Sequence, residues 1–389
     1  MDRVIDNVYS VGCKDWQCRS FHGYLTPKGV TYNSYLIMDE KICLVDLVKY
    51  TFVDEFLHNI SKIVDPSKID YIIINHVEND HTSSLPDIMK AIPGAKVYIS
   101  EKGAEEAGKL YGKYDYNVVK DGDTLSIGKK TVRFVGLPML HWPDSMATYL
   151  VEDGLLFSND AFGQHICTSH VFDDESELPH VYEELQHYYA NILMPYSRLI
   201  GPALKKAGAL DLKMICPSHG VIWRSHIADM LSKYEAWGKG ECKDKVLVIY
   251  DTMWGATERM ARAVFEGVCQ SGVEAKLYKL GTTEKSQLVA DILDSKGMLL
   301  GSPTLNYGMF PSFGEILYYL KGLKPIDKKA AVFGAYGWSG GAQKDMEELL
   351  GKAGIEVSEG YTIKWTADKE EIANCEKLGY EFAKKVCGK

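Results

Sequence analysis

The amino-acid sequence predicts a two-domain protein that joins an α+β domain to an α/β domain, and three observations support this. The chain has 389 residues, a length that corresponds to two or three domains. Up to about residue 240, short apolar stretches bounded by turn residues predict strands interspersed with helices. Beyond that point strands and helices alternate strictly, which predicts a doubly wound parallel sheet with helices on both faces.

The N-terminal domain is expected to contain many short strands. The pattern places them at 33–37, 42–46, 69–75, 96–100, 130–137, 155–158 and 214–217. Helical spacing of apolar residues places helices at 52–64, 85–91 and about 225–237. Residues 238–241, two glycines and two charged residues, then interrupt the pattern and indicate a linker. We therefore assign residues 1–243 to the first domain and residues 244–389 to the second.

The C-terminal domain is expected to contain five parallel strands. They are placed at 246–250, 275–280, 298–301, 330–335 and 362–365. Helices are expected at 258–271, 287–293 and 368–386, the last with Asp368 as its N-cap. Five such units in about 145 residues match the size and order of a doubly wound, flavodoxin-like domain.

Charge and composition exclude several classes of function. A net charge of −9 argues against a nucleic-acid or anionic-membrane surface. No apolar run approaches the length of a membrane span, and the N-terminus lacks the pattern of a secretory signal. The nine cysteines are scattered singly, which predicts a reduced, cytoplasmic protein without a CxxC iron site of its own.

Three loops at the carboxyl ends of the C-terminal strands are expected to bind a ligand with a flat ring. Ligands of doubly wound sheets bind at this edge. The first loop contains Thr252, Met253, Trp254, Gly255, Ala256 and Thr257; the second contains Pro303, Thr304, Leu305, Asn306, Tyr307 and Gly308; the third contains Ala335, Tyr336, Gly337, Trp338, Ser339, Gly340 and Gly341. Alternatively, the glycines only make turns and the aromatic residues only pack, but three such loops at one edge favour a ligand.

The first loop has the character of a phosphate site. Hydroxyl groups and free backbone N–H groups at a helix N-terminus bind anions. The loop is neither a GxGxxG fingerprint nor a Walker loop, so one phosphate is expected rather than a pyrophosphate. The loop resembles the flavodoxin motif Thr/Ser-x-Thr-Gly-x-Thr through Thr252, Gly255 and Thr257, with Trp254 in the third position. This resemblance implies FMN as the cofactor.

Seven residues of the N-terminal domain form a candidate metal site. Four of them, His76, Glu78, Asp80 and His81, follow the strand expected at 69–75. If this segment is extended, alternate side chains point the same way, so the first three converge and His81 turns in beside them. Each of the other three follows a short apolar strand and precedes a turn: His141, Asp160 and His219. The histidines without such a setting are expected to be structural: His22, His58, His165, His170, His180, His187 and His226.

The metal motif resembles that of the metallo-β-lactamase superfamily, His-x-His-x-Asp-His, with Glu78 in place of the second histidine. Three carboxylates and four imidazoles are a harder and more anionic set, which suits iron, whereas zinc prefers fewer carboxylates. A glutamate at this position, together with a flavodoxin-like domain, resembles the flavodiiron proteins, also called A-type flavoproteins. This resemblance covers essentially the whole chain and implies an N-terminal metallo-β-lactamase-like αββα sandwich.

The resemblance also implies site roles. One iron is bound by His76, Glu78 and His141, the other by Asp80, His81 and His219, and Asp160 bridges them. Pocket positions are implied for three further residues: Trp142, His22 and Tyr196.

The implied activity is an electron relay from FMN to a di-iron centre that reduces a diatomic gas. Reduction of dioxygen to water is the first choice and reduction of nitric oxide to nitrous oxide the second. The family resemblance also implies a head-to-tail homodimer, or a tetramer of such dimers. It further implies an external electron donor, for which rubredoxin is the first choice. Two alternatives stay open: a zinc hydrolase with a fused flavodoxin module, and an electron carrier whose first domain is not catalytic.

Overall fold

The computed structural model describes residues 2–388, which form two compact units. The first unit runs to Tyr188 and includes Arg198–Glu235, and the second comprises Tyr189–Ser197 and the chain from Ala236 onward. The predicted linker begins at the last residue of α7 (Ile227–Gly238) and ends before β17 (Lys243–Tyr250). A domain boundary between residues 243 and 244 stays a prediction.

Two sheets form the centre of the first unit. The seven-stranded sheet has the order β1-β2-β7-β8-β9-β10-β11 and the five-stranded sheet the order β12-β13-β14-β15-β16. The strands are β1 (Asp2–Ile5), β2 (Val8–Ser10), β7 (Tyr35–Ile37), β8 (Cys43–Val45), β9 (Tyr71–Ile74), β10 (Lys96–Ser100), β11 (Tyr116–Val119), β12 (Thr124–Ser126), β13 (Thr131–Gly136), β14 (Met146–Leu150), β15 (Leu155–Asn159) and β16 (Met214–Pro217). Buried side chains of both sheets, among them Ile73 and Phe157, share one core, so the sheets pack face to face.

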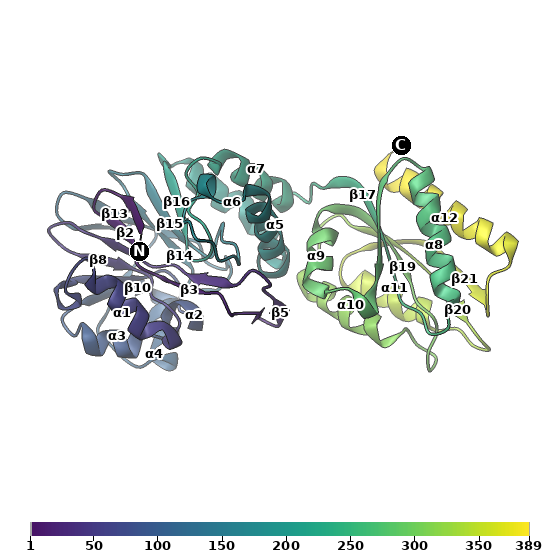
Figure 1. Cartoon of the computed structure of the whole chain (residues 1–389), viewed down its shortest axis with the longest axis horizontal. Coiled ribbons are helices and arrows are strands. Elements are labelled where there is room, and N and C mark those ends of the chain that lie inside the picture. Colours follow the sequence, from purple (N-terminus) through teal and green to yellow (C-terminus); the bar gives the residue numbers. More distant parts are fainter. Residues whose placement is uncertain (1, 389) are drawn as a thin grey trace. The chain divides into compact units, whose positions relative to one another are not determined.

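Helices cover the outer faces of this sandwich. The seven-stranded sheet packs against α1 (Val53–Ser61), α3 (Leu85–Ala91) and α4 (Glu101–Leu110) through a core that includes Phe56, Ile88 and Ile74. The helices α5 (Leu178–Tyr188), α6 (Ser197–Gly208) and α7 lie on the side of the five-stranded sheet (Figure 1). The predicted αββα sandwich is therefore confirmed. Two small hairpins pair β3 (Cys13–Asp15) with β6 (Val30–Tyr32) and β4 (Ser20–Phe21) with β5 (Tyr24–Leu25).

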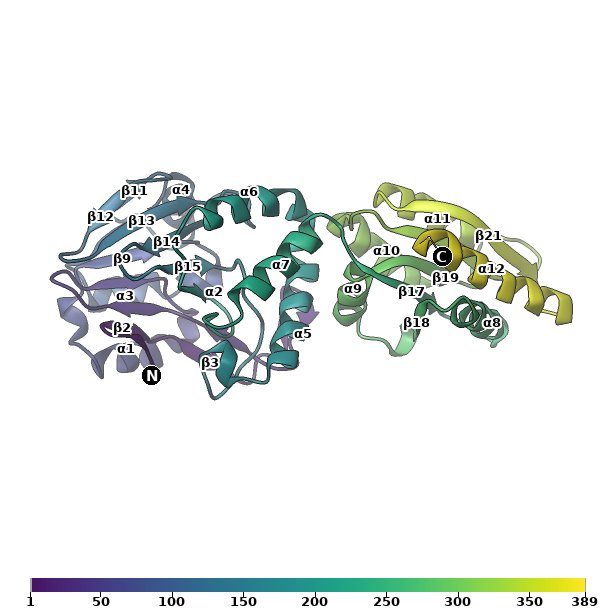
Figure 2. The same cartoon turned by 90° about the horizontal axis from the view of Figure 1, so that it is seen from above.

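The second unit contains one parallel sheet with the order β18-β17-β19-β20-β21. The further strands are β18 (Glu274–Lys279), β19 (Ser295–Gly301), β20 (Lys329–Tyr336) and β21 (Glu356–Lys364). On one face lie α8 (Ala256–Gln270) and α12 (Lys369–Cys387), and on the other lie α9 (Lys285–Leu293), α10 (Pro311–Leu323) and α11 (Ala342–Lys352) (Figures 1 and 2). The strand order is that of flavodoxin-like folds, so the predicted doubly wound domain is confirmed.

The last strand and the last helix allow two predictions from the sequence to be compared with the structure. β21 begins six residues before the predicted start at 362, because Ser358, Glu359 and Gly360 dilute the apolar pattern of this edge strand. The predicted N-cap of α12 is confirmed: the Asp368 carboxylate accepts from Glu371 N, and the Glu371 carboxylate accepts from Asp368 N. Within residues 2–388, no helix has the length and apolar character needed to cross a membrane.

Candidate metal centre and flavin site

The segment after β9 is not extended throughout, so the expected convergence of His76, Glu78 and Asp80 is wrong. Residues 79–82 form the short helix α2 (Asn79–Thr82), for which Glu78 is the N-cap residue. The helix turns Asp80 away from His76 and Glu78 and places it beside His81. The motif therefore contributes two ligand candidates to each of two neighbouring clusters.

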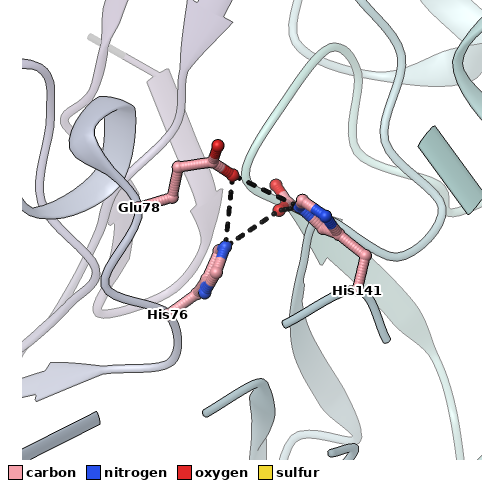
Figure 3. A group of neighbouring side chains, drawn as sticks. His76, Glu78 and His141 are labelled. Carbon is pink, nitrogen blue, oxygen red and sulfur yellow. Dashed lines mark hydrogen bonds and ion pairs between the residues drawn. The ribbon is translucent and has the colours of Figure 1, made fainter. Parts of the chain in front are cut away.

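The first cluster contains His76, Glu78, His141 and Asp160. Figure 3 shows His76 and Glu78, both from the segment after β9, pointing toward His141, which comes from the segment between β13 and β14. Glu78 Oε2 lies 3.3 Å from His76 Nε2 and 3.3 Å from His141 Nε2. Ligand atoms that share one ion at ~2.1 Å are roughly 3 Å apart, so these distances match the coordination of a single cation.

The second cluster contains Asp80, His81 and His219. His81 Nε2 lies 3.2 Å from Asp80 Oδ2, and His219 Nε2 lies 3.0 Å from the same oxygen. Asp160 connects the two clusters, because its Oδ2 lies 3.0 Å from His141 Nε2 while its Oδ1 lies 2.9 Å from His81 Nε2. One carboxylate thus faces both clusters, as a bridge between two ions must.

The residues present fit a pair of bound cations. Two buried polar atoms of these side chains lack a hydrogen bond to any described residue: Asp80 Oδ1 and His81 Nδ1. Such atoms are costly to bury unless a ligand satisfies them. The three carboxylates Glu78, Asp80 and Asp160 also make a hard, anionic set of the kind that iron accepts.

The pKa shifts of His76 and Glu78 also indicate that this site favours positive charge. Burial opposes protonation of His76, but the Asp144 and Glu78 carboxylates outweigh it and raise its pKa well above the usual range. Burial likewise opposes the ionised form of Glu78, yet hydrogen bonds from His141, His22 and His76 hold its pKa below the usual range. The carboxylates therefore draw positive charge onto the imidazoles, and bound cations would supply that charge in place of protons.

Two residues that sequence reasoning missed orient the imidazoles. Asp144 lies 68 positions from His76, and its Oδ1 accepts a hydrogen bond of 2.9 Å from His76 Nδ1. The backbone carbonyl of Thr31 accepts from His219 Nδ1 at 2.6 Å. Both contacts leave Nε2 free to face the cluster, which is the usual support of a metal-bound histidine. Asp144 could have been noticed in the sequence, because it lies three residues after His141. The Thr31 contact could not, because every residue has a backbone carbonyl.

The expectations for the surrounding residues are met in part. His22 Nε2 lies 2.6 Å from Glu78 Oε1, and the Trp142 ring lies 5.0 Å from the His76 ring, so both contact the site. Tyr196 belongs to a 3-10 turn (Met194–Tyr196) that packs with the second unit. The expectation that His165 is merely structural misses its position: its ring lies 4.9 Å from that of His219.

The first loop of the second unit has an anion site at the start of α8. The N-cap Gly255 has φ +86° and provides no side-chain cap, so the first N–H groups of the helix stay available. The Thr257 hydroxyl is fully buried and has no hydrogen-bond partner. Thr252 supports the turn by accepting from Gly255 N at 3.0 Å. A phosphate group fits these donors.

The second and third loops pack directly against each other. A Cβ atom on Gly341 would lie 1.8 Å from the Tyr307 carbonyl oxygen, so the two loops approach as closely as only glycine permits. A cavity of about 230 Å³ is lined by Thr304 of the second loop, by Tyr336 and Gly341 of the third, and by residues of β20, α11 and β21.

Large aromatic side chains surround these loops. Trp254 is 95% exposed and Trp338 is 80% exposed. Trp365, at the end of β21, also belongs to this edge, with its ring 6.3 Å from that of Trp338. Sequence reasoning missed Trp365 as a site residue, although its place after the fifth strand was a signal. Exposed flat rings at this edge offer stacking surfaces for a flavin.

We expect Gly341→Ala to weaken FMN binding at least about tenfold. Its φ of +149° is strained for any side chain, at roughly 1–3 kcal/mol, and the clash with Tyr307 would push the two loops apart. The measurement is a titration followed by quenching of flavin fluorescence. Gly340→Ala is the matched control, because a Cβ there meets no atom within 4 Å. Equal FMN affinity in the two variants would contradict the role of this contact.

The fold and the two sites define a flavin-dependent metalloprotein in which one domain holds metal ions and the other holds the flavin. Two family models match the chain: an ODP family beta lactamase over residues 30–220, and a flavodoxin over residues 248–379. A nitric oxide reductase from Moorella thermoacetica is 42% identical over 391 residues, covering 98% of each chain.

Solved structures agree with the family models. The flavodiiron protein from Giardia intestinalis has a TM-score of 0.96 at 39% identity and covers 99% of this chain and 96% of its own. The rubredoxin oxygen:oxidoreductase from Desulfovibrio gigas has a TM-score of 0.96 at 36% identity and covers 100% and 98%. The chain belongs to the flavodiiron proteins. It is an oxidoreductase whose cofactors are FMN and a di-iron centre, and this membership does not favour a zinc hydrolase.

Proposed function

We propose that this chain reduces a diatomic gas at its metal centre with electrons received through its flavin domain. Dioxygen, reduced to water, is the first candidate substrate, and nitric oxide, reduced to nitrous oxide, is the second. Similar proteins bear both kinds of name, since one is called a nitric oxide reductase and another a rubredoxin oxygen:oxidoreductase. When bound, FMN supplies electrons singly or in pairs and the two irons supply binding and activation of the gas.

The observation that supports this proposal best is the position of Asp160. Its two oxygens lie 3.0 Å and 2.9 Å from imidazoles of different clusters, a separation suited to two ions held side by side. Two ions held by these residues would supply the binding of a diatomic molecule. We assign His76, Glu78 and His141 to one iron, Asp80, His81 and His219 to the other, and Asp160 to both.

Neighbouring residues orient these ligand side chains through hydrogen bonds and an ion pair. Asp144 and the Thr31 carbonyl accept from Nδ1 of His76 and His219, so Nε2 of each imidazole would be the atom that holds a metal ion. His22 contacts Oε1 of Glu78, which leaves Oε2 to face His76 and His141. Six of the seven proposed ligands are buried and Glu78 is partly buried, so bulk water is kept from most of the site.

For the flavin we propose contacts from all three loops: the first binds the phosphate, and the second and third bind the ring. We also propose a head-to-tail homodimer, alone or within a tetramer, and an external donor of the rubredoxin type. The exposed Trp254 and Trp338 support a covered surface at this edge, because monomers rarely leave such large rings in water. The nine cysteines within residues 2–388, all without disulfides, support a reducing location such as the cytoplasm.

The proposal predicts about one FMN and two irons per chain in protein produced with iron available. Metal analysis and flavin extraction on the same sample check this number. The loaded protein, given electrons through a reduced rubredoxin, should then consume dioxygen or nitric oxide. Stoichiometric zinc without iron, or consumption of neither gas, would refute the proposal, and the ratio of the two rates ranks the substrates.

A further inference from the structure

A small cavity lies in the first unit between helix α6 and the five-stranded sheet. Its volume is about 20 Å³. Val135, Ala147 and Leu156 line it from the sheet, and Ala203 and Ala207 line it from the helix. The two alanines stand one helical turn apart on the same face of α6, and their short side chains leave the space open.

The walls of this cavity are apolar. Its one charged lining residue is Lys206, whose Nζ donates to Asp121 Oδ2 and to the Gly136 carbonyl, each at 2.7 Å. The ammonium group is thus bound elsewhere, and the alkyl stem is left to line the cavity. A buried water needs two to four polar partners, so a space with such walls stays dry and accepts small apolar guests. The volume exceeds the roughly 10–15 Å³ that one water-sized molecule requires.

Two residues that line the cavity are neighbours of proposed metal ligands in the chain. Leu140, which lines it, immediately precedes His141, and Ala161, which also lines it, immediately follows Asp160. Nε2 of His141 and Oδ2 of Asp160 are 3.0 Å apart in the first metal cluster. Ala203, which lines the cavity from α6, is only half-buried. The lining therefore combines a partly exposed helix residue with residues of the two segments that carry His141 and Asp160.

We propose that this cavity binds the apolar diatomic substrate on its way from solvent to the metal centre. Dioxygen and nitric oxide share the required chemistry, since both are small, uncharged and more soluble in apolar surroundings than in water. A guest held there would contact the segments that carry His141 and Asp160, through Leu140 and Ala161. The inference rests on the proposed function, because it names the route by which that substrate reaches the site.

Xenon, an apolar atom of similar size, tests the cavity without any chemistry. In crystals of the FMN- and iron-loaded protein under xenon pressure, we expect an atom between α6 and the sheet. Ala207→Leu should fill the space, remove the xenon, and raise the KM for dioxygen and for nitric oxide severalfold with kcat unchanged. Ala203→Leu, at a half-buried position of the lining, should act in the same direction and tests the same point if the buried substitution impairs folding.

Ala209→Leu is the matched control, since Ala209 is exposed just beyond the end of α6 and does not line the cavity. It should keep the xenon and both KM values. Absence of xenon from the wild-type cavity would overturn the inference, and so would an unchanged KM in a variant that has lost the xenon. Failure of the proposed function would give a different result. The loaded wild-type protein would then consume neither dioxygen nor nitric oxide, whether or not xenon binds in the cavity.

Discussion

Replacing Glu78 with histidine is expected to abolish gas reduction while FMN stays bound. The substitution removes one of the three carboxylates and creates an imidazole beside His22, His76 and His141, so the anionic charge that favours iron falls. The metal content should shift from iron toward zinc, which accepts more imidazole ligands. Loss of a support residue of a metal site costs 10–100-fold in activity, so loss of this proposed ligand should cost at least about 100-fold.

The measurement combines metal analysis, flavin content and rates of dioxygen and nitric oxide consumption. Glu101→His is a suitable control, because Glu101 is exposed at the start of α4 and the substitution makes the same chemical change outside the site. Retained FMN shows that the second domain is intact. Consumption of either gas at the wild-type rate by Glu78→His would show that Glu78 is not a metal ligand.

Mixing two inactive variants is expected to restore activity if each flavin serves the metal centre of a partner chain. One variant carries His76→Ala and His141→Ala, and the other carries Gly341→Ala, provided that it is verified to lack flavin. In a two-fold symmetric head-to-tail dimer, a mixed dimer has one working pair of sites out of two. Random exchange makes half of the dimers mixed, so about a quarter of the wild-type activity should return.

Exchange has to be verified by mass before the rates are compared. Each variant mixed with itself is the control and should stay inactive. Flavin-stripped wild-type protein replaces the second variant if Gly341→Ala retains FMN. A verified mixed dimer without activity would disprove the relay between subunits, although the metal and flavin assignments would stand.

Much of the fold was predictable from local patterns. Strands β17, β19 and β20 are buried on both faces, so their apolar runs alternate with amphipathic helices and reveal a parallel sheet. β21 was predicted too short, because an edge strand with Ser358 and Glu359 need not be apolar. The capping box of α12 was visible because its two partners, Asp368 and Glu371, are three residues apart.

The sequence by itself determined the types of ligand in the candidate site. The chain itself gives the order of His76, Glu78, Asp80 and His81, and it places Glu78 where the zinc hydrolase motif has its second histidine. Chemical type is a property of each residue, and a motif of six residues preserves it whatever the surrounding fold. The phosphate loop was likewise readable, because Thr252, Gly255 and Thr257 belong to one continuous turn.

Only the tertiary structure decided how these groups are arranged. The turn of α2 sends Asp80 to His219 rather than to His76, and the two oxygens of Asp160 face different clusters. Asp144 reaches His76 from 68 positions away, and the carbonyl that orients His219 belongs to Thr31. The physical reason is that coordination and hydrogen bonding depend on distances of about 3 Å between segments far apart in the chain, and often on backbone atoms that every residue shares.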